Sequence, residues 1–408
     1  MTAPARKKSQ FAVMGRNRII HTYFLDKPTG SPIELEKDST IGPCRVFTDL
    51  IISDAAGKRK ENNMNTHVVI AGTGSRLPKF ILTNHALSRM VDTSDEWIVS
   101  HTGIRTRHIC TDETLLDLAQ GAARAALENA GMSPDELDLI IVASSTQEML
   151  YPSIACQLQA ALGADRAFGF DMGGQACAGF LFALDAASRY VRTGGAKTVL
   201  CVSAEKLSLT TDFTDRGTCC IFGDGAGAVV LRAGEAPGLL ASYLATAGSR
   251  GSYITCSLPW PDNPFSKLSQ MGLPPAHTRM DGHEVFKFAV RAVPEAIDAV
   301  LEKAGLGIAD ISKIILHQAN LRIIESAINR YGLPPEKFPI TIDRHGNTSS
   351  ASIPLVLDEL NRAGELRPGD KLIFVAFGGG LTYGSVLVEW RAEGKEERYE
   401  QHAAGACK

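Results

Sequence analysis

Apolar and polar positions follow two different periods along most of this chain. Short apolar runs that are rich in β-branched residues and bounded by turn signals predict strands, which we place at residues 139–143, 198–203, 313–317 and 371–377. Longer stretches between them have the spacing of amphipathic helices, and we place helices at residues 114–130, 178–192, 284–304 and 350–363. Strands that are apolar throughout belong in sheets covered on both faces. The pattern therefore predicts an α/β fold with buried sheets.

The pattern also repeats once. A glycine-containing helix end followed by a strand occurs at residues 130–142 and again, 174 residues later, at 304–316. The same offset relates the run 195–197 to the run 369–371, and it relates Cys177 to Ala351. Two similar halves related by a pseudo-twofold axis would bring their strand ends to one central site. The alternative is that the two helix-loop-strand units resemble each other by chance. We expect internally duplicated halves.

The two ends of the chain lack this pattern. Residues 1–63 carry scattered charge without sustained periodicity, which predicts an extension that is either disordered or not translated. If the extension is not translated, we expect translation to begin at Met64. Lys60-Glu61, shortly before it, can be encoded by a sequence that resembles a bacterial ribosome-binding site. A transit peptide is disfavoured, since the segment is poor in arginine and not amphipathic. We predict one half at residues 64–238, a second at 239–392 and a polar tail at 393–408.

Composition and charge restrict the classes of function. The 408 residues are 44% hydrophobic and carry a formal net charge of −3, which gives no general affinity for nucleic acid. No apolar run approaches the roughly 20 residues that a membrane helix needs, so we predict no membrane span. The nine cysteines are odd in number and lack C-x-x-C spacing. They indicate reduced thiols in the cytoplasm and no metal site.

Cys177 is the candidate nucleophile. It lies in the run Gly-Gly-Gln-Ala-Cys-Ala-Gly-Phe at residues 173–180, directly before a predicted helix. Small neighbours allow a tight turn, and a thiol at a helix N-terminus faces the positive end of the helix dipole, which favours the thiolate. The ordinary alternative is a buried, inert cysteine. The glycines on both sides favour the functional interpretation.

Three other turns carry candidate partners for this thiol. His317 falls at a strand-to-helix turn, where a purely structural histidine is the alternative. Asn347 lies in the polar run 343–350, which is equally typical of a turn followed by a helix cap. The glycines at 378–380 let backbone amides approach a ligand closely. One of these amides, together with that of Cys177, would stabilise a thioester oxyanion.

Three further runs resemble nucleotide-binding features. Residues 223–228 fit G-x-G-x-x-A but precede a strand, and the run 72–74 lacks its third small residue, so we reject dinucleotide binding for both. Trp97, near Arg105 and Arg107, would suit a flat base such as adenine. A capped helix with a core tryptophan is the ordinary alternative.

Taken together, these motifs resemble the β-ketoacyl-[acyl-carrier-protein] synthase III family of the thiolase superfamily. The resemblance spans residues 64–391, about four-fifths of the chain, and rests on the runs 92–98, 102–105, 215–218, 222–228, 317–322, 343–354 and 377–380. It implies a thiolase-like, five-layered αβαβα fold and a homodimer. It also implies a reaction that uses no metal or cofactor, only acyl-CoA and malonyl-[acyl-carrier protein].

The resemblance assigns a role to each site residue. Cys177 takes an acyl group from a short acyl-CoA primer while the amides of Cys177 and Gly379 hold the oxyanion. His317 and Asn347 then stabilise the enolate that malonyl-[acyl-carrier protein] forms on losing CO2, and this carbanion attacks the Cys177 thioester. The product is a β-ketoacyl-[acyl-carrier protein], which initiates fatty-acid biosynthesis.

The remaining matched positions bind the substrates. Those that contact CoA in the family are Trp97, Thr93, Arg216, Gly282 and Asn320. Lys287 and Arg322 match a basic patch that docks the acidic carrier protein, and Tyr151 and Phe377 match positions of the acyl pocket.

Three departures from the family pattern keep alternatives open. The stretch from Asp171 to Cys177 is one residue longer than the family pattern, Tyr151 replaces a phenylalanine and His101 replaces an arginine at the CoA entrance. The extra residue is compatible with a ketosynthase-III-like acyltransferase or condensing enzyme of secondary metabolism. A catalytically idle dimer partner or acyl-CoA-binding regulator is a third hypothesis. A hydroxymethylglutaryl-CoA synthase would need a glutamate beside the nucleophile, for which Glu148 is the only near candidate.

Overall fold

The computed structural model describes residues 12–15, 18–21, 66–258, 262, 264–265, 271–272 and 276–391. The chain divides into two compact units, residues 1–60 and 61–408, which are described separately. In the first unit, β1 (Ala12–Gly15) and β2 (Arg18–His21) pair as an antiparallel hairpin, which the hydrophobic pattern did not predict. The rest of the predicted extension, the proposed start at Met64 and the tail at 393–408 lie outside the described residues.

Two sheets form the centre of the second unit. The first has the strand order β3 (His67–Arg76), β9 (Gly225–Gly234), β8 (Thr198–Glu205), β6 (Leu139–Ala143) and β7 (Phe168–Met172). The second has the order β10 (Leu239–Thr246), β15 (Thr382–Glu389), β14 (Lys371–Gly378) and β13 (Lys313–Leu316). Every residue of β6 and β8 is buried; β6 is apolar throughout, whereas β8 also contains Thr198, Ser203 and Glu205.

The two sheets repeat one topology. In the first sheet β6 and β8 are parallel, and β9 and then β3 follow in antiparallel order. In the second sheet β13 and β14 are parallel, and β15 and then β10 follow in antiparallel order. The glycines paired by the sequence repeat, Gly131 and Gly305, both end a helix in the left-handed conformation, with φ of 61° and 67°. The predicted internal duplication is confirmed.

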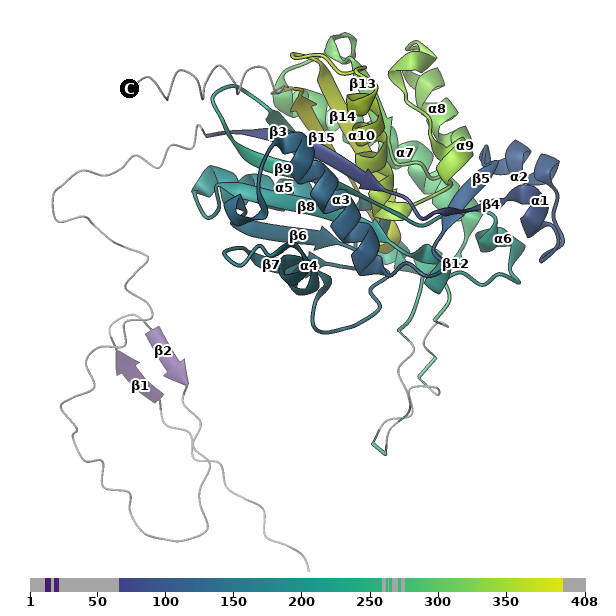
Figure 1. Cartoon of the computed structure of the whole chain (residues 1–408), viewed down its shortest axis with the longest axis horizontal. Helices are drawn as coiled ribbons and strands as arrows, with labels where there is room; N and C mark the ends of the chain where they lie inside the picture. The colour runs from purple at the N-terminus through teal and green to yellow at the C-terminus, as the bar shows by residue number, and fades with distance from the viewer. Residues whose placement is uncertain are drawn as a thin grey trace, which may run out of the picture. The chain divides into compact units, whose positions relative to one another are not determined.

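Helices cover both sheets and fill the space between them (Figure 1). One outer layer holds α3 (Leu115–Ala130) and α4 (Ile154–Leu162), which pack on the first sheet. The middle layer holds α5 (Gly179–Thr193) and α10 (Ser352–Arg362), whose apolar residues share one core with both sheets. The other outer layer holds α7 (Gly282–Ala304) and α8 (Leu321–Tyr331), against the second sheet. These five layers are the αβαβα architecture predicted from the sequence.

Strand β6 illustrates how the layers are held together. Leu139 and Ile141 contribute to the central core, whereas Ile140 and Val142 point into the outer core against α3 and α4. Successive side chains of a strand point to opposite faces, so an unbroken apolar run supplies both cores at once. Each such side chain contributes about 1.5–3 kcal/mol when it leaves water.

The glycines of the first strand have a packing role. A Cβ atom on Gly72 would lie 2.5 Å from the carbonyl oxygen of Ala126, and one on Gly74 would lie 2.2 Å from its amide nitrogen. Because no side chain fits there, α3 approaches β3 closely. Close helix packing therefore accounts for the run 72–74, in agreement with its rejection as a nucleotide motif.

The remaining helices and strands are short. They are β4 (Phe80–Thr83), α1 (Asn84–Leu87), α2 (Asp95–Thr102), β5 (Thr106–Ile109), α6 (Arg216–Cys219), β11 (Ile254–Thr255), β12 (Arg279–Met280) and α9 (Ile342–His345). Among the helices of the described residues, none has the length and apolarity that crossing a membrane requires.

Candidate active site

Cys177 lies in a strained turn between β7 and α5. A short 3-10 helix, η3 (Ala176–Ala178), leads directly into α5, so the helix begins behind the thiol as predicted. Ala176 has φ of 43°, a left-handed conformation that costs roughly 1–2 kcal/mol for a residue with a side chain. Strain of this kind is kept only where the surrounding structure enforces it.

The loop from Asp171 to Cys177 is the stretch predicted to be one residue longer than the family pattern. The amide of Gln175 donates to the carbonyl oxygen of Gly173 at 2.6 Å, which closes a tight turn around Gly174. Gly174 has φ of 65°, and a Cβ atom built on it would meet nothing within 4 Å. The loop therefore bulges outward at exposed glycines and leaves the start of α5 intact.

Burial dominates the acidity of the Cys177 thiol. Desolvation raises its pKa to about 12; a hydrogen bond with the Ser349 hydroxyl acts in the opposite direction, and the nearby Glu205 carboxylate raises the pKa further. The expectation that the helix start would favour the thiolate is wrong for the resting protein, because loss of water outweighs the helix dipole. Resting Cys177 is therefore a thiol near neutral pH.

Asn347 is held by backbone contacts from the first half. Its amide donates to the Ile221 carbonyl at 3.0 Å, and its carbonyl accepts from the Gly223 amide at 3.0 Å. The Ser349 amide donates to Asn347 Oδ1 at 2.8 Å, at the start of the 3-10 helix η9 (Ser349–Ala351). This contact engages the side-chain oxygen and directs the Nδ2 group away from Ser349.

The glycine run 223–227 makes this approach feasible. A Cβ atom on Gly223 would lie 2.4 Å from the His345 carbonyl oxygen, and one on Gly227 would lie 2.8 Å from Pro354. The glycines let β9 pack directly against the Asn347 turn and α10. They thus position the site, in agreement with their rejection as a dinucleotide motif.

His317 follows the last residue of β13 and is buried. Its Nδ1 atom lies 2.7 Å from the Ser352 hydroxyl oxygen, which also accepts from the Gln318 amide at 3.3 Å. In the tautomer whose Nδ1 accepts from the Ser352 hydroxyl, the ring proton is on Nε2. Burial lowers the pKa of His317 to about 3, so the ring is neutral near pH 7 and can donate from Nε2.

The end of β14 connects these groups to the nucleophile. The Phe377 ring packs edge-on against His317, with 5.7 Å between ring centres. A Cβ atom on Gly378 would lie 2.6 Å from the Cys177 amide nitrogen, and one on Gly379 would lie 3.3 Å from the Ala176 side chain. Cys177 therefore lies at the end of β14, which also contacts His317. Ser349, which affects the Cys177 thiol and binds Asn347, relates Cys177 to the Asn347 turn.

A second cluster surrounds Trp97 on α2. The His101 ring stacks on the indole at 4.4 Å with 19° between the planes, and the Arg216 guanidinium lies 4.6 Å from the indole centre. Asn320 Nδ2 donates to the His101 carbonyl at 3.0 Å, and Arg322 donates to the Ser100 carbonyl at 2.8 Å. His101 and Arg216 thus contact the Trp97 ring, while Asn320 and Arg322, at the start of α8, bind the backbone of α2.

Comparison with known proteins identifies the chain. Two family descriptions match: 3-Oxoacyl-[acyl-carrier-protein (ACP)] synthase III over residues 170–248, and the C-terminal part of the same family over residues 301–390. The beta-ketoacyl-[acyl-carrier-protein] synthase III of Clostridium acetobutylicum is 46% identical and that of Xanthomonas campestris pv. campestris is 48% identical, each over 79% of this chain and 98% of the relative. The chain belongs to the synthase III family.

A solved structure agrees with this family assignment. The crystal structure of 3-oxoacyl-[acyl-carrier-protein] synthase III from Aquifex aeolicus VF5 is 44% identical, with a TM-score of 0.73 over 79% of this chain and 100% of that one. The synthase III resemblance and the thiolase-like fold predicted from the sequence are therefore confirmed.

Other predicted synthase III positions lie outside these two clusters. Gly282 begins α7, and Lys287 on the same helix pairs with Glu284 at 2.7 Å. The Thr93 hydroxyl lies 3.9 Å from the Cys220 thiol, next to α6. Tyr151 is 79% exposed and follows the exposed Leu150. Within the described part of the chain, no three His, Cys, Asp or Glu side chains are grouped to hold a metal ion.

Sequence reasoning missed three residues of this site. Glu205 ends β8 and is buried near Cys177, whereas Glu148, the acidic candidate from the sequence, is exposed and paired with Lys206. Ser349 lowers the pKa of the Cys177 thiol, and the Ser352 hydroxyl contacts His317 Nδ1. Glu205 could have been noticed in the sequence, because it is a carboxylate close behind the predicted strand at residues 198–203. Hydroxyls in a serine-rich helix start carry no such signal.

Proposed function

We propose that this protein catalyses the decarboxylative condensation of a short acyl-CoA with malonyl-[acyl-carrier protein], which initiates fatty-acid biosynthesis. The observation that carries the proposal is that the end of β14 joins Cys177 to a neutral His317, while Ser349, which lowers the pKa of Cys177, donates its amide to Asn347 Oδ1. The two relatives at 46% and 48% identity bear the synthase III name, which favours this reaction over a condensation in secondary metabolism.

In the first step Cys177 becomes acylated. The thiol loses its proton as its sulfur attacks the acyl-CoA carbonyl, and CoA leaves as a thiolate that recovers a proton. The amides of Cys177 and Gly379 hold the oxyanion of the tetrahedral intermediate. Support comes from the close approach of the Gly378 backbone to the Cys177 amide.

In the second step the malonyl group loses CO2. The electrons of the broken carbon–carbon bond form an enolate, whose oxygen accepts hydrogen bonds from His317 Nε2 and Asn347 Nδ2. The enolate carbon attacks the Cys177 thioester, and the thiolate of Cys177 is released. Neutral donors suit this step, since no proton has to be removed from the malonyl group.

The surrounding residues select the substrates. Trp97 and Arg216 offer an aromatic face and a guanidinium for the adenine of CoA, with Thr93, Gly282 and Asn320 as further contacts. Lys287 and Arg322 dock the acidic carrier protein. Phe377, packed on His317, borders the acyl chain. The reaction needs no cofactor besides its two substrates, and we place it in the cytoplasm.

Substrate use provides the test of this proposal. Wild-type protein should release CO2 and form a β-ketoacyl product from acetyl-CoA or another short acyl-CoA, with malonyl-[acyl-carrier protein] preferred over malonyl-CoA as the extender. Product analysis by mass spectrometry across acyl-CoAs from acetyl to octanoyl measures this. Condensation only with long or unusual acyl groups would favour secondary metabolism, and no condensation at all would favour the regulator hypothesis.

We also propose that two copies associate through the edge of the first sheet. Strand β7 is the outer strand of that sheet, and its first residue, Phe168, is 48% exposed. Tyr151 and Leu150 add exposed apolar surface, and the dimer would place Tyr151 at the partner's acyl pocket. An open edge with apolar side chains is suited to pairing.

Light scattering on a sizing column measures this association. Wild-type protein should have twice the mass of one chain, and Phe168→Asp should shift it to the mass of a single chain, because a charge at the edge opposes pairing. The exposed Phe80→Asp serves as a matched control that should leave the dimer intact. A wild-type protein with the mass of one chain would contradict the proposal.

A further inference from the structure

Glu205 is a buried carboxyl group that the proposed reaction does not use. It ends β8 and has 0% exposure. Its Oε2 atom accepts from the Thr146 hydroxyl at 2.9 Å and from the Ser145 amide at 3.1 Å, both in the first half. Its Oε1 atom accepts from the hydroxyls of Ser350 at 2.7 Å and Ser349 at 3.2 Å, both in the second half. One side chain therefore connects the two halves at the site.

Ser349 carries this connection to the reacting groups. Its hydroxyl is also near enough to the Cys177 thiol to lower the pKa of that thiol, and its amide donates to Asn347 Oδ1 at 2.8 Å. Ser349 has φ of 52°, one of two described non-glycine residues with positive φ; the other, Ala176, precedes the nucleophile. A strained residue needs neighbours that hold it, and Glu205 holds the hydroxyl of Ser349 and that of the next residue.

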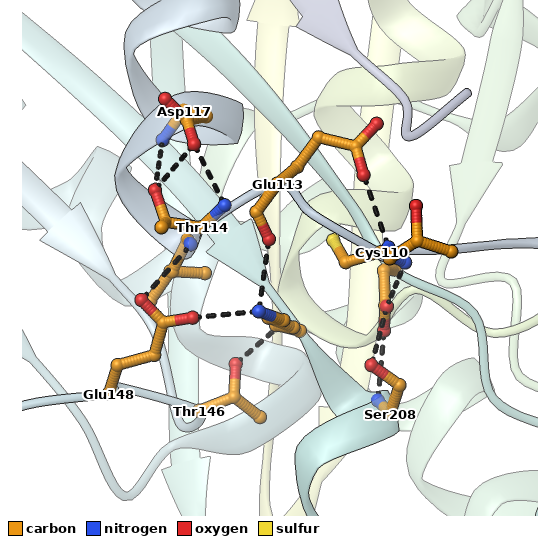
Figure 2. Close-up of polar contacts among 11 residues, drawn as sticks. Cys110, Glu113, Thr114, Asp117, Thr146, Glu148 and Ser208 are labelled. Atoms are coloured by element: carbon orange, nitrogen blue, oxygen red, sulfur yellow. Dashed lines mark hydrogen bonds and ion pairs between the residues drawn. The ribbon is translucent and has the colours of Figure 1, made fainter. Parts of the chain in front are cut away.

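On its other side, Glu205 is anchored by a network that reaches the surface. Thr146 donates to Glu205 and accepts from the Lys206 amide at 2.8 Å, while the Lys206 ammonium binds Glu148 at 2.9 Å. Figure 2 shows Thr146 and Glu148 in the outer part of this network. Glu148 is exposed and also accepts from the Leu115 amide at 3.3 Å. The network thus contains two glutamates, one joined to Ser349 and one facing solvent.

We propose that Glu205 is a positioning residue of the condensing site, which acts through Ser349 on Cys177 and Asn347. Its carboxyl group fixes the Ser349 hydroxyl against the sulfur and keeps the strained turn in the shape that presents Asn347 Nδ2 to the thioester carbonyl. The inference rests on the proposed function. Burial also raises the pKa of Glu205, which is consistent with a carboxyl group retained for its hydrogen bonds.

Kinetics of the two half-reactions test this role. Glu205→Ala should lower kcat for condensation about a hundredfold, the size of effect expected from a displacement of reacting groups by roughly 1 Å. The KM for acyl-CoA should stay unchanged, since the Trp97 cluster lies on other elements. Glu205→Gln keeps one acceptor oxygen and the side-chain size, so it should recover most of the lost rate. Glu302→Gln, at an exposed position of α7 outside this network, is the matched control and should behave as wild type.

A double mutant identifies the path of the effect. Glu205→Ala should cost much less in a Ser349→Ala background than in the wild-type background, because the two residues act as one unit. Wild-type rates in both Glu205 variants would overturn the proposal. So would an equal loss of acylation, condensation and thermal stability without rescue by glutamine, which marks a purely structural residue. A wild-type protein that does not condense at all would instead refute the proposed function.

Discussion

Replacing Cys177 by alanine should abolish the acyl-enzyme and reduce condensation by at least about 10³-fold, because no other group can carry the acyl chain. After incubation with acetyl-CoA, intact-protein mass spectrometry should show one added acetyl group on the wild type and none on the variant. The thiol is small and lies in a turn of small residues, so alanine should leave the fold in place.

A cysteine elsewhere provides the control for that result. Cys156 on α4 is an exposed, free thiol. The variant Cys156→Ala should be acylated and should condense at the wild-type rate. An acetyl adduct that persists on Cys177→Ala but disappears on Cys156→Ala would show that the structure has been assigned the wrong nucleophile. Full condensation by Cys177→Ser would support a role without a covalent intermediate.

Asn347→Asp should slow malonyl decarboxylation about 10²–10³-fold, the usual cost of removing one oxyanion donor. Aspartate retains the oxygen that accepts from the Ser349 amide, so the turn should persist. It replaces the donating Nδ2 group with a negative charge that repels the enolate. Acylation of Cys177 precedes this step and should change by only a few fold. Release of CO2 and the mass of the acyl-enzyme measure the two steps separately.

Asn129→Asp on α3 supplies the matched control: its Oδ1 also accepts from a backbone amide, that of Thr73 at 3.0 Å, and aspartate keeps this oxygen, so both steps should be unchanged. Equal loss of acylation and decarboxylation in Asn347→Asp would contradict the assigned role. The pH profile gives an independent check on the second donor. Because the pKa of His317 is about 3, its ring stays neutral as the pH rises from 6 to 8. A decarboxylation rate that falls through pH 6.5 would indicate a cationic histidine instead.

Element positions were predictable where one physical effect dominated. The strand at residues 139–143 agrees with β6, because a fully buried strand is apolar from end to end. The strand predicted at 198–203 continues to Glu205 in the structure, since its last residues are small or polar but still buried. The helix predicted at 284–304 begins at Gly282, where Asp281 caps it. Hydrophobic periodicity alone thus fails to locate the ends of helices and strands where those ends are formed by polar residues.

The sequence by itself determined the duplicated α/β architecture, the synthase III resemblance and the turns that hold Cys177, His317 and Asn347. Local spacing and residue type carry that information, because helices, strands and glycine turns depend mainly on neighbours along the chain. Only the tertiary structure decided the protonation of the site: burial keeps Cys177 a thiol and His317 neutral. It alone brought Glu205, Ser349 and Ser352 to the nucleophile and its partners, since these contacts join segments far apart in sequence.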